Sequence, residues 1–168
     1  MANLEVLDHG APIAFSFDDL LKYHGFGYPG GVAHAFKVME RAFPLLSPGN
    51  PPERHGISIE TAFPGPGGRD AFEMVTRAVT GGRYRVDDAF APAGTLASPK
   101  GRYFFRLAYE GGTVELVLRG GLVKDEFVDL ARRGPATPAE EERLVWLKQD
   151  MADRLMSLPA DQVYDRAG

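Results

Sequence analysis

The residues best suited to chemistry lie in one turn, Tyr23–Gly31, which runs into an apolar periodic segment. Its glycines let the backbone approach a ligand closely, and the free N–H groups of the helix that follows would point outward. His24 could be a metal ligand or a proton carrier, because imidazole titrates near neutrality; alternatively, it only hydrogen-bonds the turn. Tyr28 could donate a hydrogen bond to a ligand, or it could be a packed aromatic that covers the turn.

A second glycine-rich turn, Pro64–Gly68, leads into a predicted helix with Arg69 at its start. Backbone N–H groups and a guanidinium suit a carboxylate or a phosphate. The run lacks the Lys-Ser/Thr of a nucleotide P-loop, so it could also be a strand-to-helix connection with a solvated arginine. Asp70 could be a charge that favours the helix dipole. We expect both helix starts to converge on an anionic small molecule, in a pocket formed by His24, Phe26, Tyr28, Phe63, Gly67, Gly68 and Arg69.

The other histidines give no readable metal site. His34 lies one turn into the first long helix, either toward the same pocket or, as we expect, partly exposed. His55 precedes a predicted strand, and His9 stands alone near the N-terminus. With four histidines and no cysteine, a three-ligand site would require distant segments to converge. The spacing does not demand this.

Composition limits the class of protein. At 168 residues, 44% hydrophobic and 25% charged, the chain predicts a single domain over residues 1–168. The formal charge of −4 with scattered Lys and Arg argues against nucleic acid as a partner. No apolar run approaches the roughly 20 residues that cross a bilayer, and the first residues lack the basic-then-apolar pattern of a secretion signal, so we expect no membrane partner and a cytoplasmic location. Without cysteine there are no disulfides, thiolate zinc sites or iron–sulfur clusters.

The elements that must position these residues follow from capping and periodicity. Residues 1–14 are expected to be surface coil. A Ser16–Asp19 capping box predicts a short helix over 17–23. Helical spacing predicts a long helix over 31–43 that Pro44 stops. The remaining predictions are a strand at 57–63, a helix at 69–80, a strand at 83–86, an irregular segment at 88–101, a hairpin of 103–109 with 114–118, and helices at 121–133 and from Thr137 to 157.

This order predicts an α+β fold: helix, strand, helix, then three strands, in a mixed sheet covered by helices, with further helices at the C-terminus. Trp146 is expected in the core or at a subunit interface. Val163 and Tyr164 are expected to pack back onto the body of the protein.

The first turn resembles the signature of the FmdE-like family of formylmethanofuran dehydrogenase components, a His-Gly-His-x-Cys-Pro-Gly run that opens the first core helix. Here the run reads His24-Gly25-Phe26-Gly27-Tyr28-Pro29-Gly30. Phe26 replaces a histidine and Tyr28 a cysteine, and these are the two metal-ligand positions. The resemblance covers about residues 15–165, because further family positions coincide with Glu60-Thr61, Asp70-Ala71, Thr76 and Leu158-Pro159.

The resemblance implies a sheet with a strand order like that in the C-terminal domain of glyceraldehyde-3-phosphate dehydrogenase, and it implies a homodimer. No firmly held cofactor is predicted, although His24 could hold a weakly bound divalent metal such as zinc.

Three functions remain open. The first, which we prefer, is an accessory or binding protein that holds a small ligand or a loosely bound metal and could belong to an oxidoreductase complex. The second is an enzyme with His24 as base and Tyr28 as acid, against which stands the lack of a third, orienting group at readable spacing. The third is a structural subunit with a decayed site.

Overall fold

The structure, a computed structural model, describes residues 3–167, so residues 1, 2 and 168 of the predicted domain lie outside the described part. This part contains five α-helices, three short 3-10 turns and seven strands in two sheets. In chain order the elements are β1 (Leu4–Asp8), β2 (Ala11–Phe15), α1 (Phe17–His24), α2 (Pro29–Leu46), η1 (Arg54–Gly56), β3 (Ser58–Thr61), α3 (Pro66–Thr76), β4 (Tyr84–Val86), η2 (Asp88–Phe90), β5 (Phe104–Tyr109), β6 (Gly112–Leu118), α4 (Asp125–Arg133), α5 (Pro138–Met156), η3 (Ala160–Gln162) and β7 (Tyr164–Arg166).

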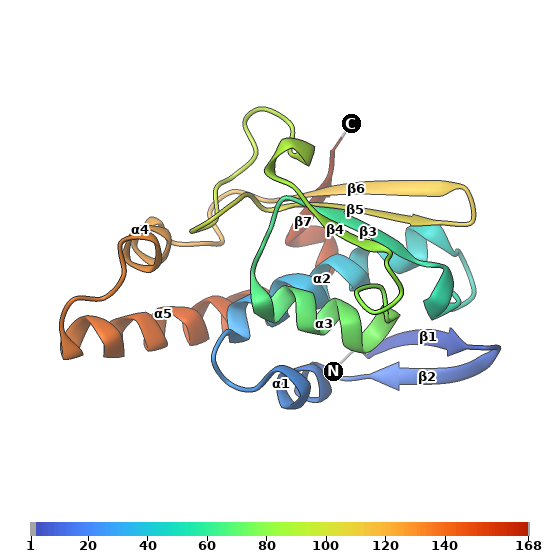
Figure 1. Ribbon diagram of the computed structural model, residues 1–168, viewed down its shortest axis with the longest axis horizontal. Coiled ribbons are helices and arrows are strands. Elements are labelled where there is room, and N and C mark those ends of the chain that lie inside the picture. Colours follow the sequence, from blue (N-terminus) through green and yellow to red (C-terminus); the bar gives the residue numbers. More distant parts are fainter. Residues whose placement is uncertain (1–2, 168) are drawn as a thin grey trace.

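The main sheet has the strand order β4-β3-β5-β6-β7. Only β3 and β4 are parallel, and the other three pairs are antiparallel, so the sheet is mixed. Helices α2 and α3 lie beneath it, and α1 with the β1–β2 hairpin forms a further layer below them (Figure 1). The predicted α+β class is confirmed.

Helix α2 is the centre of the packing. It contacts α1, α3, α5 and the main sheet, and it is buried nearly all round from Pro29 to Phe43. An apolar helix without a polar face needs neighbours on every side to cover it. The position of α2 therefore determines where the other helices lie, including those that surround the candidate site.

The predicted start of α1 is confirmed by its cap. The Ser16 hydroxyl accepts a hydrogen bond from the Asp19 N–H at 3.0 Å, and the Asp19 carboxylate accepts one from the Ser16 N–H at 2.9 Å. The predicted end of α2 is wrong, because the helix passes through Pro44 to Leu46. A proline in the last turn removes only one intrahelical hydrogen bond, and the Ser47 N–H still bonds the Phe43 carbonyl at 2.9 Å.

The expectation of coil over residues 1–14 is wrong for the part that the structure describes. Leu4 and Val6 alternate with polar residues, and both are buried. Their strand pairs with β2 through a two-residue turn, His9-Gly10, in which both residues have positive φ, 50° and 86°. This conformation suits a hairpin turn, but histidine at its first position is not a usual signal for one.

Three helix boundaries and one strand also differ from the predictions. Helix α3 starts at Pro66, three residues early, and ends at Thr76, because Arg77 adopts the left-handed conformation with φ of 57°. Helix α4 starts at residue 125 instead of 121. Tyr164 is buried as expected, but it also opens β7, which the sequence did not predict.

The remaining predicted elements are close to those observed. The strand at 57–63, the strand at 83–86, the hairpin and the last helix all correspond to described elements. No helix in residues 3–167 combines the length and the apolar character that crossing a membrane requires.

Candidate functional site

A cavity of about 380 Å³ lies where the starts of α2 and α3 meet the α4–α5 pair. The segment 98–103, which enters β5, forms its remaining wall. Most of the lining is apolar, aromatic or glycine, and it comes from segments far apart in the chain: Tyr28, Gly30, Gly31, His34, Phe63, Pro64, Gly65, Pro66, Gly67, Ser98, Pro99, Lys100, Tyr103, Phe127, Ala131, Leu144, Lys148 and Met151.

The two helix starts touch backbone to backbone. A Cβ atom added at Gly67 would lie 2.6 Å from the carbonyl oxygen of Tyr28, and one added at Gly31 would lie 3.2 Å from the Gly68 nitrogen. Each helix has proline at its first position and no side-chain cap. The first N–H groups of both helices therefore lack a side-chain partner beside the cavity, where the helix dipoles favour negative charge.

His34 is the most unusual group in the cavity wall. Its side chain is fully buried, and its ring stacks on Tyr103 with 4.4 Å between centroids. Nδ1 lies 2.8 Å from the Tyr164 hydroxyl, whereas the opposite nitrogen, Nε2, is buried without a hydrogen-bond partner. The expectation that His34 is partly exposed is wrong, because α2 is covered on all sides.

Burial sets the protonation state of this pair. It lowers the pKa of His34 to about 3, since the imidazolium would lose its hydration. Burial also raises the pKa of the Tyr164 phenol well above its ordinary value. Both groups are neutral at physiological pH, and Nε2 can donate or accept according to the tautomer that Tyr164 stabilises.

Two further polar groups face this region. The Ser98 hydroxyl is buried without a partner, while the Ser98 and Pro99 carbonyls accept hydrogen bonds from Arg132 at 3.0 and 3.1 Å, which fasten the segment to α4. Lys148 on α5 donates to the Gly27 carbonyl at 3.2 Å, and partial burial lowers its pKa.

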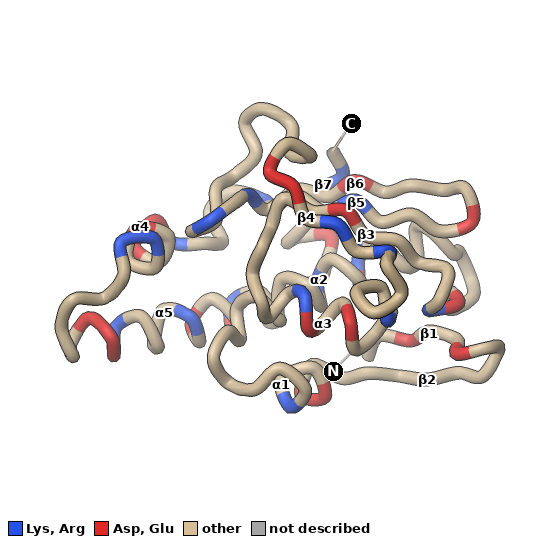
Figure 2. Tube along the Cα trace, viewed as in Figure 1, with Lys and Arg blue, Asp and Glu red and all other residues tan. Residues whose placement is uncertain are grey.

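The charge at the cavity has one sign. Lys100 and Lys148 both line it, and its lining contains no Asp or Glu. Figure 2 shows Lys and Arg on α4, on the neighbouring loop and along α5, and it shows Asp and Glu on both helices as well, so the single sign belongs to the lining itself. The cavity therefore combines an apolar wall with basic groups and with unpartnered hydrogen-bonding atoms.

The predicted pocket residues divide into two groups. Tyr28, Phe63 and Gly67 line the cavity, as the convergence of the two turns requires. The other four do not line it: His24, Phe26, Gly68 and Arg69. Gly68 lies at the contact with α2.

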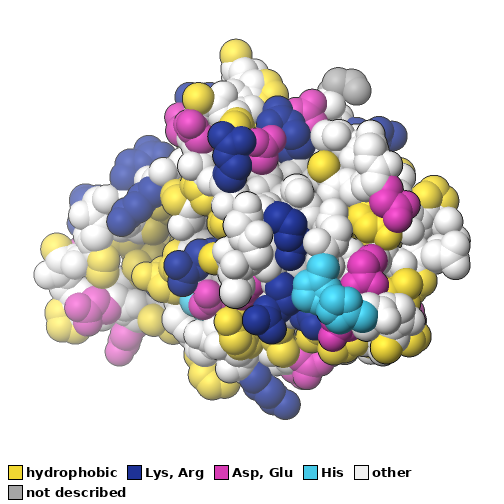
Figure 3. Space-filling model, turned by 45° about the vertical axis from the view of Figure 1, so that its right-hand side comes forward, with side chains coloured by type: hydrophobic (Ala, Val, Ile, Leu, Met, Phe, Trp, Pro, Cys, Tyr) yellow, Lys and Arg dark blue, Asp and Glu magenta, His cyan; other side chains and the backbone are white. Residues whose placement is uncertain are grey.

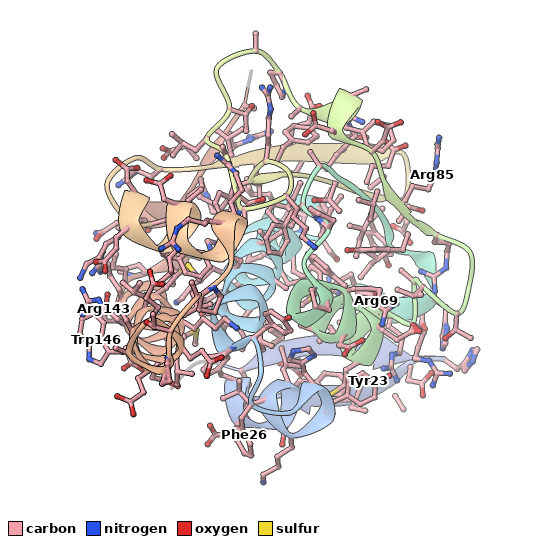
Figure 4. The ribbon with its side chains drawn as sticks, turned by 60° about the vertical axis from the view of Figure 1, so that its left-hand side comes forward. Tyr23, Phe26, Arg69, Arg85, Arg143 and Trp146 are labelled. Atoms are coloured by element: carbon pink, nitrogen blue, oxygen red, sulfur yellow. The ribbon has the colours of Figure 1, made fainter. Side chains whose placement is uncertain are left out.

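Phe26 and Arg69 point away from the cavity. Phe26 is 85% exposed, and Figure 4 shows it at the edge of the molecule, by the α1–α2 connection. Arg69 lies on the side of α3 turned away from α4 and α5, where its guanidinium is 3.4 Å from Asp70 (Figure 4).

His24 forms a separate pair with Asp70. Its Nδ1 lies 2.8 Å from an Asp70 carboxylate oxygen, and its Nε2 is buried without a hydrogen-bond partner. The Tyr28 ring is tilted against it, with 5.8 Å between centroids. Asp70 thus supplies the orienting group that the sequence spacing did not show.

Sequence reasoning missed His34 as a buried group, and it missed Ser98, Tyr103 and Lys148. The spacing of His34 from Gly31 did place it correctly in the first turns of α2. No local sequence pattern indicates that Lys148 on α5 contacts the glycine turn, where it donates to the Gly27 carbonyl.

Among residues 3–167, His24 belongs to no group of three side chains that could hold a metal ion. Within the described residues, one group of three His, Cys, Asp or Glu side chains is close enough to hold a metal ion, namely Asp8, His9 and His55. These residues lie at the β1–β2 turn and in η1, and none of them lines the cavity.

Comparisons of the chain with protein-family models and with curated proteins find no match.

Proposed function

We propose that the protein binds an anionic small molecule in the cavity between the starts of α2 and α3. The observation that carries this proposal is the buried, unpartnered Nε2 of His34 in a wall that contains two lysines and no carboxylate. A buried polar atom without a partner costs free energy, which a ligand that hydrogen-bonds it would recover.

The lining also indicates the body of the ligand. Phe63 and Tyr103 stack with 5.3 Å between their centroids, and Tyr103 continues the stack onto His34. Flat aromatic walls suit a planar or apolar group. Lys100, Lys148 and the uncapped helix starts suit a carboxylate or a phosphate. We therefore infer a metabolite with an apolar or planar body and one anionic group.

The protonation state of His34 favours binding over acid–base catalysis. A general base works best when its pKa is near the operating pH, whereas burial lowers the pKa of His34 to about 3. An imidazole with this pKa stays uncharged near pH 7 and can act there as a hydrogen-bonding group. It is suited to recognising a ligand.

A thermal-shift screen of carboxylate and phosphate metabolites tests the proposal. For ligands that raise the melting temperature, we expect Lys148→Met to weaken binding by roughly 10- to 150-fold, as the loss of a charge-assisted contact of about 1.5–3 kcal/mol implies. His34→Gln should also weaken it. Arg69→Ala removes a cation that lies outside the cavity and should bind as wild type does. Equal binding by all three variants would place the ligand elsewhere.

The His24–Asp70 pair favours one second candidate, an enzyme in which Asp70 orients His24 as base and Tyr28 acts as acid. Such a pair resembles the base-and-orienter arrangement of many hydrolases. His24 does not line the cavity, as His34 does, so a substrate could reach its buried Nε2 only if the turn opened. Turnover of a metabolite from the screen by wild type, lost in Asp70→Asn, would establish this role in place of simple binding.

We further propose that the chain is a cysteine-free relative of the FmdE-like formylmethanofuran dehydrogenase components, cytoplasmic, and accessory to an oxidoreductase complex. Support comes from the matching turn residues His24, Gly25, Pro29 and Gly30. The mixed sheet covered by helices is compatible with the proposed likeness to the C-terminal domain of glyceraldehyde-3-phosphate dehydrogenase. Copurification of the tagged protein with an oxidoreductase would support the accessory role.

A further inference from the structure

The β1–β2 hairpin and η1 bring Asp8 and its neighbour His9 together with His55, which lies 47 residues after Asp8 in the chain. The rings of His9 and His55 stack, with 4.7 Å between their centroids. Histidine side chains are visible at the molecular surface here, beside both acidic and basic side chains (Figure 3). The site is therefore open to solvent, unlike the cavity at the helix starts.

The three side chains present their ligand atoms to one point. Asp8 Oδ1 lies 2.9 Å from His55 Nε2 and 3.8 Å from His9 Nε2. All three ligand atoms lie within 4.8 Å of one another. Two ligands of one tetrahedral zinc ion, each about 2.1 Å from it, are about 3.4 Å apart. Small rotations of exposed side chains would bring the three atoms to this spacing.

The backbone that carries these residues is fixed without help from the three side chains. The Leu7 N–H bonds the Pro52 carbonyl at 2.8 Å, which joins β1 to the chain before η1. The Glu53 carboxylate accepts hydrogen bonds from the N–H groups of His9 and Gly10, at 2.9 and 3.1 Å. Glu53 thus holds the turn that carries His9 against η1, which carries His55. A metal ion would find its ligands already positioned.

We propose that Asp8, His9 and His55 form a binding site for a zinc-class transition-metal ion, with water in the remaining coordination positions. Two imidazoles and one carboxylate suit Zn²⁺, Ni²⁺ or Cu²⁺, whereas Mg²⁺ and Ca²⁺ require mainly oxygen ligands. The ion would link the hairpin to η1. This proposal concerns a different part of the molecule from the anion cavity and does not depend on the function proposed for it.

The surroundings limit the affinity. The Arg54 guanidinium lies 3.8 Å from the second Asp8 oxygen, and this positive charge opposes the metal ion. The ligands are also exposed, so water competes for the ion. We expect micromolar binding of one Zn²⁺ per chain, weaker than that of a closed cysteine site.

Isothermal titration of the chelator-treated protein with Zn²⁺ tests the site. Wild type should bind one ion, and a hundredfold excess of Zn²⁺ over Kd should raise the melting temperature by about 5–10 °C. His9→Asn and His55→Gln should each weaken binding at least tenfold. A loss of about tenfold or more is usual when a group that only hydrogen-bonds a metal ligand is removed, and these variants remove the ligands themselves. Asparagine is chosen at position 9 because it tolerates positive φ.

His24→Gln is the matched control, because it removes the histidine that the family resemblance implicates and should leave zinc binding unchanged. NMR of histidine ring nitrogens in the wild-type protein gives a second measurement that needs no variant, and Zn²⁺ should shift the signals of His9 and His55. The proposal fails if Zn²⁺ does not bind at millimolar concentration. It also fails if binding survives in the His9→Asn/His55→Gln double variant or is lost in His24→Gln.

Discussion

At the scale of single residues, His34 makes the stability of the protein depend on pH. Burial lowers its pKa from 6.5 to about 3 in the folded state, so between these values the unfolded chain binds a proton that the folded chain does not. The stabilisation is complete above pH 6.5 and is lost as the pH falls toward 3. We expect this residue to remove about 1.4 kcal/mol of unfolding free energy for each pH unit in that window.

Urea unfolding at pH 6.0, 5.0 and 4.0 measures this loss when wild type is compared with His34→Gln, which has no group that titrates at this position. Carboxylates that titrate in the same range contribute equally to both proteins, so the difference isolates His34. Parallel stability curves for the two proteins would mean that the imidazole is hydrated in the folded state and that the cavity is wetter than its lining implies.

At the scale of elements, α2 and α3 approach each other through glycines beside the cavity. Gly67→Ala would place a methyl group 2.6 Å from the Tyr28 carbonyl oxygen, where backbone would have to move. We expect a loss of about 1–3 kcal/mol of unfolding free energy, the usual cost of overpacking, and weaker ligand binding.

Gly27→Ala is the control for this change, because an added Cβ there meets nothing within 4 Å and the residue does not have positive φ. Chemical denaturation of both variants provides the comparison. We expect Gly27→Ala to change the unfolding free energy by about 0.5 kcal/mol or less. If Gly67→Ala is equally mild, the helices do not pack as closely as the structure indicates.

The elements that the sequence predicted well are those with local signals. The α1 capping box, the β5–β6 hairpin and Pro138 at the start of α5 each depend on residues within a few positions of one another. Of the elements that it missed, the β1–β2 hairpin is local but has an unusual turn, His9-Gly10, whereas β7 depends on a distant partner. Strand β7 has three residues, and only its pairing with β6 makes it a strand.

The candidate site follows the same rule. The two glycine turns indicated that Tyr28 and Gly67 come together, because both turns open helices. The burial of His34 depends on Tyr103 and Tyr164, which are 69 and 130 residues away along the chain, so helical spacing alone could not show it. His55 likewise meets Asp8 only through the pairing of β1 with the chain near Glu53.

At the scale of the whole molecule, α5 extends from the body of the protein (Figure 1). Trp146 is 49% exposed and Val145 is 67% exposed, so the core alternative for Trp146 is wrong and the subunit-interface alternative stays a prediction. Arg143 lies over the Trp146 ring at 4.5 Å, and Lys124 lies over it at 4.9 Å. Figure 4 shows Trp146 and Arg143 together on this helix.

We predict that this face of α5 pairs with the same face of a second chain in a homodimer. Aromatic side chains and arginine are enriched where protein surfaces associate, and a two-fold axis would place each Trp146 within one shared interface. Light scattering at micromolar concentration should give the mass of two chains. Val145→Asp should give that of one, because the new charge would be buried between the subunits without a partner.

Leu96→Asp is the matched control, since it places the same charge on another exposed apolar residue, 42% exposed, in the loop before β5. It should remain dimeric. A monomeric mass for wild type would contradict the prediction, and dissociation by Leu96→Asp but not by Val145→Asp would move the interface to that loop. If the dimer forms through α5, it also holds Lys148 and Met151 of the cavity wall in place, so Val145→Asp should weaken binding of the anionic ligand although position 145 does not line the cavity.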